Sequence, residues 1–178
     1  MQSHLLEAQD ALSHQATHDF LTGIFNRRAI LDRLAQEISR AKRENASLSI
    51  GMCDIDHFKI INDANGHKAG DEALVIFTRC IQGRLRDYDS LGRYGGEEFL
   101  VIAPGSVGHS GESLYERLRA GVAAAEITTK AGMVSLTISI GVAAGTGQSN
   151  VDALIAAADA ALYQAKADGR NRVVYASR

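Results

Sequence analysis

One stretch decides the fold of this chain: Arg93-Tyr94-Gly95-Gly96-Glu97-Glu98-Phe99-Leu100-Val101-Ile102. Two glycines separate a short extended segment from an apolar run, so the pattern predicts a tight two-residue hairpin with positive φ at both glycines. The second strand then begins with Glu97 and Glu98, whose side chains point to opposite faces. Adjacent carboxylates suit a divalent cation, and a tip without side chains lets another molecule approach the backbone. Taken alone, such a hairpin is most often only a turn.

A second acidic cluster, Asp54-Ile55-Asp56, follows another apolar run over residues 47–53, which is typical of a strand. A carboxylate at the end of a buried strand is costly unless it is paired or bound to a metal. If the two strands are neighbours, Asp54, Asp56 and Glu97 converge. Oxygen ligands without a nearby His or Cys set favour magnesium or manganese over zinc. The alternative is that each cluster consists of solvated acids at a strand end.

The composition indicates one globular domain with a substantial core, because 46% of the 178 residues are hydrophobic and 22% are charged. A net charge of −2 offers no broad basic field, which argues against a nucleic-acid polymer as partner. No apolar run approaches the roughly 20 residues that span a bilayer, and Met1 opens no secretory signal. We therefore expect a cytoplasmic domain, and a membrane tether elsewhere in a full-length protein stays open. Cys53 and Cys80 are expected to be buried free thiols.

The order of elements predicts the fold class. Asn26 is expected to precede a helix over residues 27–41. Further helices are expected over 58–62, 67–87, 113–125 and 151–167, and strands over 47–53, 91–94, 97–103, 134–142 and 172–176. Helices segregated over a mixed, mainly antiparallel sheet indicate an α+β fold rather than a doubly wound sheet.

Residues 1–17 are predicted to form a separate N-terminal helix ahead of the globular domain at 18–178. The apolar stripe of this helix is too thin for it to fold alone. It is either the end of a longer coiled coil from an upstream sensor domain that this chain lacks, or a helix that packs on the core. In the first case it would transmit a signal to the domain.

Asn62, His67 and Asp71 form a third constellation. His67 and Asp71 are four residues apart and face the same way at the start of a helix. An amide and a carboxylate together can read guanine, since the carboxylate accepts from N1–H and the exocyclic amine. The alternative is ordinary stabilisation of a positive helix N-terminus.

Two groups of cations are candidates for phosphate binding. Lys59, Lys166 and Arg170 are suited to phosphate oxygens, although Lys166 and Arg170 would equally complement the dipole at a helix C-terminus. Arg86 and Asp89 stand just before the glycine hairpin. They are either a surface ion pair or an exposed arginine fork that can bind a phosphate or a guanine edge.

Several motifs occur in a fixed order along the chain. They are Asp19-x-Leu21-Thr22-Gly23-x-x-Asn26-Arg27-Arg28, Asp54-Ile55-Asp56-His57-Phe58-Lys59-x-Ile61-Asn62-Asp63, Gly66-His67-x-x-Gly70-Asp71, Arg93-Tyr94-Gly95-Gly96-Glu97-Glu98-Phe99, Ile138-Ser139-Ile140-Gly141-Val142-Ala143 and Ala161-Leu162-Tyr163-x-Ala165-Lys166-x-x-Gly169-Arg170-Asn171. Together they resemble the GGDEF domain of bacterial diguanylate cyclases over about residues 17–176.

The resemblance implies a palm-like fold shared with nucleotidyl cyclases and polymerases. It also implies a magnesium-dependent nucleotidyltransferase, with manganese as a possible substitute, that condenses two GTP molecules into cyclic di-GMP and releases two pyrophosphates. Because the chain carries one such constellation, two subunits related by a two-fold axis would have to meet, so we expect a homodimer. Cyclic di-GMP would act as both product and allosteric inhibitor.

The resemblance also assigns roles by position. Asp54 and Glu97 match magnesium ligands through their carboxylates, and Ile55 matches one through its carbonyl. Glu97 also matches the candidate base for the 3′-hydroxyl, and Glu98 matches a residue that supports the metal or the hairpin. The remaining matches are Asn62 and Asp71 to guanine readers, His67 to a substrate contact, Phe58 and Lys59 to a phosphate-binding turn, Lys166 and Arg170 to the γ end of the triphosphate, and Arg86, Asp89 and Arg117 to the inhibitory product site.

Three other functions compete with a cyclase. A catalytically silent module that binds cyclic di-GMP or GTP would be favoured by a degenerate hairpin or the loss of Asp54, and neither is seen. A cyclase that makes a hybrid dinucleotide with adenine is disfavoured because Asp71 suits guanine. A structural dimerisation domain would leave the aligned carboxylates unexplained.

Overall fold

A computed structural model of the chain describes residues 14–105 and 113–177. Most of the predicted helix at 1–17 lies outside these residues, and its last residues, 14–17, are helical. The elements follow in the order α2 (Arg27–Glu44), β1 (Ser47–Ile55), α3 (Phe58–Asn65), α4 (His67–Gln82), β2 (Ser90–Arg93), β3 (Glu98–Pro104), α5 (Leu114–Ala123), β4 (Ile127–Thr129), β5 (Gly132–Val134), β6 (Ile138–Thr146), α6 (Val151–Ala167) and β7 (Val173–Tyr175).

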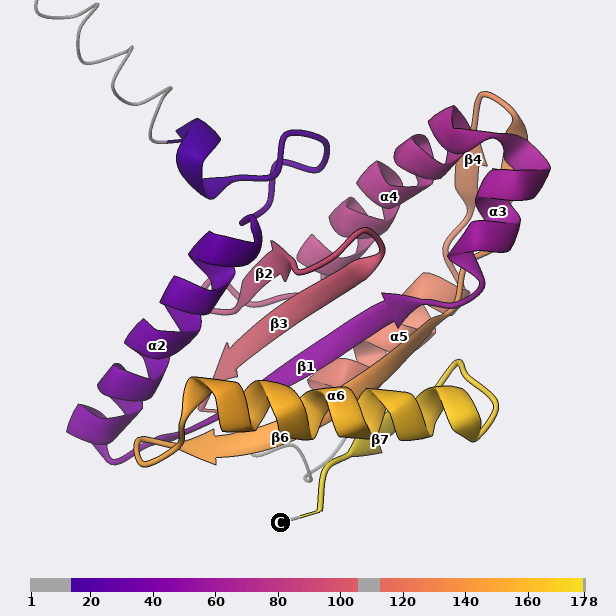
Figure 1. The fold of residues 1–178 in the computed structure, drawn as a ribbon. Helices are drawn as coiled ribbons and strands as arrows, with labels where there is room; N and C mark the ends of the chain where they lie inside the picture. Colours follow the sequence, from indigo (N-terminus) through magenta and orange to yellow (C-terminus); the bar gives the residue numbers. More distant parts are fainter. Residues whose placement is uncertain (1–13, 106–112, 178) are drawn as a thin grey trace, which may run out of the picture.

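The main sheet has five strands in the order β2-β3-β1-β6-β7, and β4 pairs with β5 in a separate hairpin (Figure 1). Neighbouring strands are antiparallel except for β6 and β7. The central strand β1 pairs with β3 and β6, and Asp54 lies opposite both Glu98 and Ser139. The mixed, mainly antiparallel sheet confirms the predicted α+β fold.

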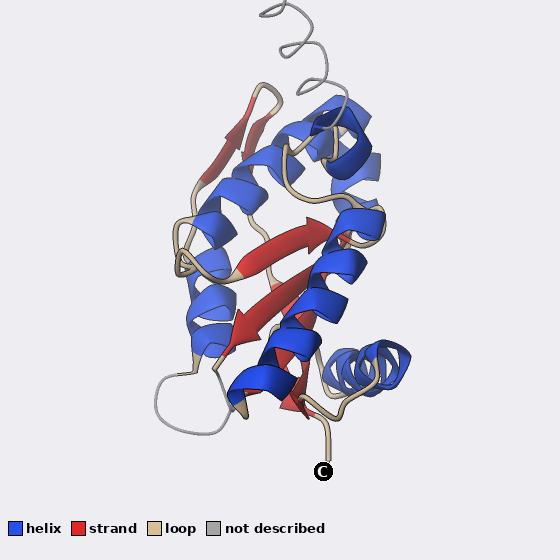
Figure 2. Cartoon of the chain, turned by 90° about the vertical axis from the view of Figure 1, so that its left-hand side faces the viewer, coloured by secondary structure: helices blue, strands red, loops and turns tan. Residues whose placement is uncertain are grey.

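Helices cover both faces of this sheet (Figure 2). Because side chains alternate along β1, Ile50 and Met52 face α2 and α6, whereas Cys53 and Ile55 face α4 and α5. Burial of apolar side chains in both layers supplies the main stabilising term for the fold. Among the described helices, none is both long and apolar enough to cross a bilayer.

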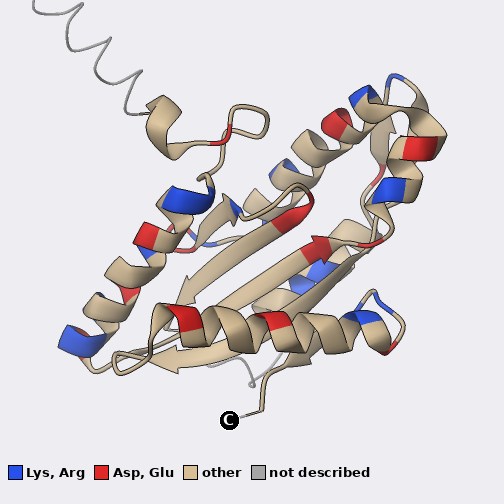
Figure 3. Cartoon of the chain, viewed as in Figure 1, with Lys and Arg blue, Asp and Glu red and all other residues tan. Residues whose placement is uncertain are grey.

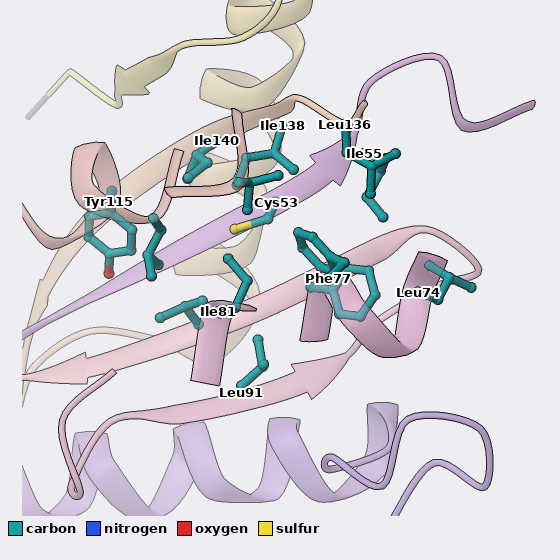
Figure 4. Close-up of a cluster of buried hydrophobic side chains, with 14 of the residues drawn as sticks. Cys53, Ile55, Leu74, Phe77, Ile81, Leu91, Tyr115, Leu136, Ile138 and Ile140 are labelled. Carbon is teal, nitrogen blue, oxygen red and sulfur yellow. The ribbon is translucent and has the colours of Figure 1, made fainter. Parts of the chain in front are cut away.

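The layer between the sheet and helices α4 and α5 is shown in Figure 4, where Phe77 and Tyr115 pack against side chains from β1 and β6. Cys53 is buried in this layer, and burial raises the pKa of its thiol to about 12. Both cysteines are free, as expected, although Cys80 is only partly buried. A thiol held protonated by its apolar surroundings is inert, so Cys53 is a packing residue.

Helix α6 lies directly on the backbone of β6 at Gly141. A Cβ atom at Gly141 would stand 2.1 Å from the carbonyl oxygen of Ala158 and 2.2 Å from the amide nitrogen of Leu162. Only glycine permits this approach. Lys166 follows Leu162 by about one helical turn, so this contact determines where its side chain meets the sheet.

The structure differs from the sequence predictions most clearly after α4 and before β6. Helix α4 ends at Gln82 rather than near residue 87, because Gly83 follows and its N–H closes the last turn on the carbonyl of Arg79. The strand predicted over 134–142 begins later, at Ile138, and continues to Thr146 as β6. The β4–β5 hairpin was not predicted, since its strands have three residues each and give almost no periodic signal.

The predicted geometry of the glycine hairpin was wrong. Neither Gly95 nor Gly96 has a positive φ. The N–H groups of Tyr94 and Gly95 both donate to the carbonyl of Glu98, at 2.8 and 3.1 Å, so the turn is longer than two residues and Glu97 belongs to it. Strand β3 therefore begins at Glu98.

Candidate active site

The candidate active site lies where the end of β1 meets the start of β3. Figure 3 shows acidic positions at these neighbouring strand ends and a basic position near the end of α6. Asp54 is only 7% exposed, and its Oδ2 lies 3.0 Å from Nζ of Lys166. The sequence separates these two residues widely, and the packing of α6 on the sheet brings them into contact.

Asp54 and Glu97 act on each other electrostatically. Burial raises the pKa of Asp54, and the charges of Glu98 and Asp56 raise it further, while Lys166 opposes both effects. Burial likewise raises the pKa of Glu97, with the Asp54 charge as the next cause. The carbonyl of Glu97 also accepts from the Ile55 N–H at 3.2 Å, which ties the turn to the end of β1. Asp54 and Glu97 therefore lie near each other where β1 meets the glycine turn, and their joint hold on a metal ion stays a prediction.

The chemistry of these donors fits a hard divalent cation. Two mutually repelling carboxylates with one nearby lysine, which pairs with Asp54, retain excess negative charge. In the parts of the chain that the structure describes, no three His, Cys, Asp or Glu side chains are grouped for metal binding. Magnesium is commonly held by one or two carboxylates together with water and substrate phosphates, so a two-carboxylate site suits it.

Glu98 has a different position from Glu97. It stands opposite Asp54 in the strand register, and its carboxylate lies over Gly95, where an added Cβ would be 2.6 Å from Oε2. This carboxylate therefore packs against the turn while its charge still acts on Asp54. Of the two roles predicted for Glu98, this geometry favours support of the hairpin over support of the metal.

Asp56 does not join Asp54 and Glu97, which corrects the predicted three-carboxylate convergence. Its carboxylate accepts from Thr137 Oγ1 at 2.7 Å, Ser139 Oγ at 2.7 Å and the Asn171 N–H at 3.0 Å. A buried carboxylate with three donors is satisfied without a metal. Asp56 instead anchors the loop after α6 to the sheet.

A clamp that we did not predict holds the glycine turn from outside. The guanidinium of Arg93 donates to the Gly96 carbonyl from Nε at 3.1 Å and from Nη2 at 2.7 Å. Its Nη1 lies 3.2 Å from both carboxylate oxygens of Asp19. Although burial raises the pKa of Asp19, hydrogen bonds from Thr22 and the charge of Arg93 lower it overall. The signal for this clamp was the presence of Asp19, Thr22 and Arg93 in the motifs.

The predicted guanine readers lie at the junction of α3 and α4. Asn62 packs against the backbone of Gly70, where an added Cβ would be 1.8 Å from Asn62 Oδ1. Asp71 is the next residue, and it is exposed, as is His67 at the start of α4. The absence of a side chain at Gly70 thus brings the amide of Asn62 beside Asp71 on an open surface.

The turn between β1 and α3 carries Phe58 and Lys59. The Phe58 side chain is buried in the core, which leaves only its main chain available to a ligand, whereas Lys59 is exposed. Helix α3 begins without a side-chain cap, after His57 in the left-handed region at φ 55°. Uncapped N–H groups at a helix start are suited to phosphate oxygens.

The loop after α6 places Arg170 beside this region. Arg170 and Asn171 both have positive φ, at 64° and 44°, which is uncommon for residues other than glycine. Asp56 holds this conformation through the Asn171 N–H, and Arg119 Nη1 donates to Asn171 Oδ1 at 2.8 Å. The Asp56 anchor therefore also positions Arg170.

A second cluster, made of Arg86, Asp89 and Arg117, lies away from Asp54. Asp89 Oδ2 accepts from the main-chain N–H of Arg86 at 2.9 Å, while the Arg86 guanidinium donates to the Tyr88 hydroxyl at 2.9 Å. The two charged side chains therefore do not form the simple surface ion pair that was the alternative prediction. Burial raises the pKa of Asp89, and the charges of Arg86 and Arg117 oppose this rise.

The described surface is hollowed next to this cluster. One cavity of about 330 Å³ is lined by Arg86, Tyr88 and the C-terminal half of α2. A second, of about 260 Å³, is lined by Arg86, Asp89 and residues 23–25. The Oδ1 atom of Asp89 is buried and accepts no hydrogen bond in the described structure. Unpaired polar atoms and open volume make this surface a candidate ligand site.

The domain is an α+β sheet that carries neighbouring carboxylates at a glycine turn. Residues 16–172 match the family model described as "Diguanylate cyclase, GGDEF domain". The chain belongs to the GGDEF family, which confirms the resemblance drawn from its motifs.

Three relatives illustrate this membership. The chain is 44% identical to the diguanylate cyclase DgcP of Pseudomonas aeruginosa over 89% of its length and 24% of that protein, and 42% identical to the response regulator PleD of Caulobacter vibrioides over 89% and 36%. A solved structure of the coiled coil and GGDEF domain of DgcB from Caulobacter crescentus, in complex with c-di-GMP, superposes with a TM-score of 0.91 at 30% identity, covering 98% of this chain and 93% of that one. The chain thus spans less than half the length of these two curated relatives.

Proposed function

We propose that this domain is a diguanylate cyclase that converts two molecules of GTP into cyclic di-GMP. Each ribose 3′-oxygen attacks the α-phosphorus of the other nucleotide. Two P–O bonds form, two bonds between the α-phosphorus and the bridging oxygen break, and two pyrophosphates leave, while the two hydroxyl protons pass to base or solvent. The family and its curated relatives support this class of reaction.

The observation that supports the proposal is the placement of Asp54 and Glu97 where the end of β1 meets the glycine turn, with Lys166 Nζ 3.0 Å from Asp54 Oδ2. Phosphoryl transfer depends chiefly on positioning and on neutralising charge, and these residues supply ligands for a cation and one cation of their own. Asp54 and Glu97 would hold magnesium, together with the carbonyl of Ile55. When bound, the ion supplies positive charge to the phosphate oxygens and acidifies the ribose hydroxyl.

The other residues would bind and orient the nucleotide. Asn62 and Asp71 present an amide and a carboxylate to the guanine edge, with His67 beside them. The main chain at Phe58 and the ammonium of Lys59 face the phosphates, and Lys166 and Arg170 neutralise the γ end. Glu97 would also accept the 3′-hydroxyl proton, and its raised pKa, which brings it closer to the range useful for a base, supports this role.

The reaction requires two active sites, because one domain offers one such constellation. We propose that two subunits meet face to face around a two-fold axis, each holding one GTP. Specific activity should then rise with protein concentration until the dimer is fully formed. Specific activity that stays constant with a verified monomer would contradict this arrangement.

Product inhibition is the regulatory part of the proposal. Arg86, Asp89 and Arg117 would bind cyclic di-GMP through its phosphates and guanine edges, since a planar guanidinium matches both kinds of acceptor. The unpaired Asp89 Oδ1 and the adjoining cavities support a ligand here.

The test is incubation with GTP and Mg²⁺, followed by chromatographic and mass-spectrometric identification of the product. Glu97→Gln should reduce the rate about a thousandfold, since it removes a base and a metal ligand together while keeping the shape of the side chain. The exposed Glu126→Gln, which makes the same chemical change elsewhere, serves as control. Nucleotide binding without any product in the unmodified protein would instead support a silent binding module.

A further inference from the structure

Lys166 forms an ion pair with one carboxylate oxygen of Asp54, a proposed metal ligand. Its Nζ lies 3.0 Å from Asp54 Oδ2, and this is the ion pair that the structure gives for Asp54. Lys166 belongs to the last turn of α6, and its side chain is one-third exposed. The lysine therefore stands at the solvent side of a nearly buried carboxylate, on the route to it.

The surrounding charges make this lysine an internal counter-ion. Asp54 experiences the negative charges of Glu98 and Asp56, and among the described residues Lys166 provides the offsetting positive charge. The same ammonium acts on Glu97. A divalent ion that entered while Lys166 remained in place would face a positive charge at contact distance, which opposes its binding.

Lys166 also has alternative anionic partners. Asp159 stands seven residues earlier, about two turns along the same helix, and the charge of Lys166 acts on it together with that of Arg27. A lysine has a flexible four-carbon stem, so its ammonium can leave one acceptor for another within reach. A triphosphate arriving beside α6 offers far more negative charge than Asp54 does.

We propose that Lys166 is a placeholder for the metal: it closes Asp54 to free divalent ions and withdraws when a nucleoside triphosphate arrives with its own ion. The ligand of this site is then a metal–nucleotide complex rather than a metal followed by a nucleotide. This inference rests on the proposed function, because it takes Asp54 as a metal ligand.

The experiment measures Mn²⁺ binding without nucleotide, from the electron paramagnetic resonance signal of the free ion. Lys166→Met removes the charge and keeps an unbranched side chain of similar length. We expect this variant to bind Mn²⁺ about tenfold more tightly than the unmodified protein. Lys42→Met removes the same charge from an exposed position on α2 and should leave Mn²⁺ affinity unchanged.

A double variant locates the effect. Asp54→Asn combined with Lys166→Met should lose the tenfold gain, since the uncovered carboxylate is gone. Equal or weaker Mn²⁺ binding by Lys166→Met, or a gain that survives in the double variant, would overturn the placeholder role. The assay contains no GTP, so its outcome is independent of the cyclase activity. The placeholder role can be refuted while the protein still makes cyclic di-GMP, and the Mn²⁺ result can hold even if the protein makes no cyclic di-GMP.

Discussion

The edge of the sheet around Asp54 and the surface around Arg86 are built in opposite ways. At the first, a nearly buried carboxylate is paired with Lys166 and the glycine turn is held by Arg93 and Asp19. At the second, Arg86 is exposed and two cavities adjoin it. Phosphoryl transfer needs groups that are already in position, whereas a regulatory site can be completed by its ligand. Under the proposed function, the contrast therefore separates a preorganised catalytic site from an inhibitory site that its ligand would complete.

The largest effect that sharpens this contrast is expected from Arg93→Ala. The change removes both hydrogen bonds to the Gly96 carbonyl and the ion pair with Asp19, which frees the turn that carries Glu97. We expect cyclisation to slow about a hundredfold, because a small displacement of a reacting group has that cost. The measurement is the initial rate of cyclic di-GMP formation at saturating GTP.

Two further measurements show whether the effect is local. Cyclic di-GMP affinity, from calorimetry, should change little in Arg93→Ala, since the Arg86 cluster lies elsewhere. Arg43→Ala, an exposed position on α2, controls for the loss of one arginine. A normal rate in Arg93→Ala would mean that the turn needs no clamp and that the active site is less preorganised than the contacts suggest.

Arg86→Ala tests the other region. It removes the guanidinium proposed to bind the product, so the cyclic di-GMP concentration that halves the rate should rise about tenfold, as for a lost charged hydrogen bond. The readout is the ratio of rates with and without added product, in which any change in the starting rate cancels. Arg79→Ala, exposed in the last turn of α4, is the matched control. An unchanged ratio would remove Arg86 from the inhibitory site.

The smallest effect is expected from Tyr88→Phe. The Tyr88 hydroxyl accepts from Arg86 Nη1 at 2.9 Å, and this bond has to break before Arg86 can bind a ligand. Removal of the hydroxyl alone should tighten cyclic di-GMP binding about two- to threefold, the size of a solvent-exposed hydrogen bond. Calorimetry on Tyr88→Phe beside Tyr88→Ala separates the hydroxyl from the ring. Weaker binding by Tyr88→Phe would show that the phenol contacts the ligand.

Local rules predicted the regular elements well. Asn26 was expected to precede a helix, and its side chain caps α2 by accepting from the Ala29 N–H. The alanine-rich pattern over 151–167 matched α6 residue for residue. These predictions succeeded because helix periodicity and capping depend on residues only a few positions apart.

The prediction of the glycine turn failed for a non-local reason. Glycine pairs favour positive φ in short hairpins, but here the Gly96 carbonyl is held by the Arg93 side chain, which is itself held by Asp19. Similarly, Asp56 looks like part of an acidic cluster in the sequence, whereas donors from β6 and the loop after α6 satisfy it. Two carboxylates that are close together in the sequence can therefore have different partners and different roles in the structure.

The sequence alone was enough to predict a GGDEF-type α+β fold, a set of carboxylates suited to magnesium and an arginine cluster suited to a guanine nucleotide. Periodicity, caps and motif spacing encode these features locally. Only the tertiary structure decided that Asp54 pairs with Lys166, that Asp56 is an anchor and that Asp19 supports the turn through Arg93. Such contacts join strands, helices and loops far apart in the chain, and they exist because the backbones pack closely, as α6 does on Gly141.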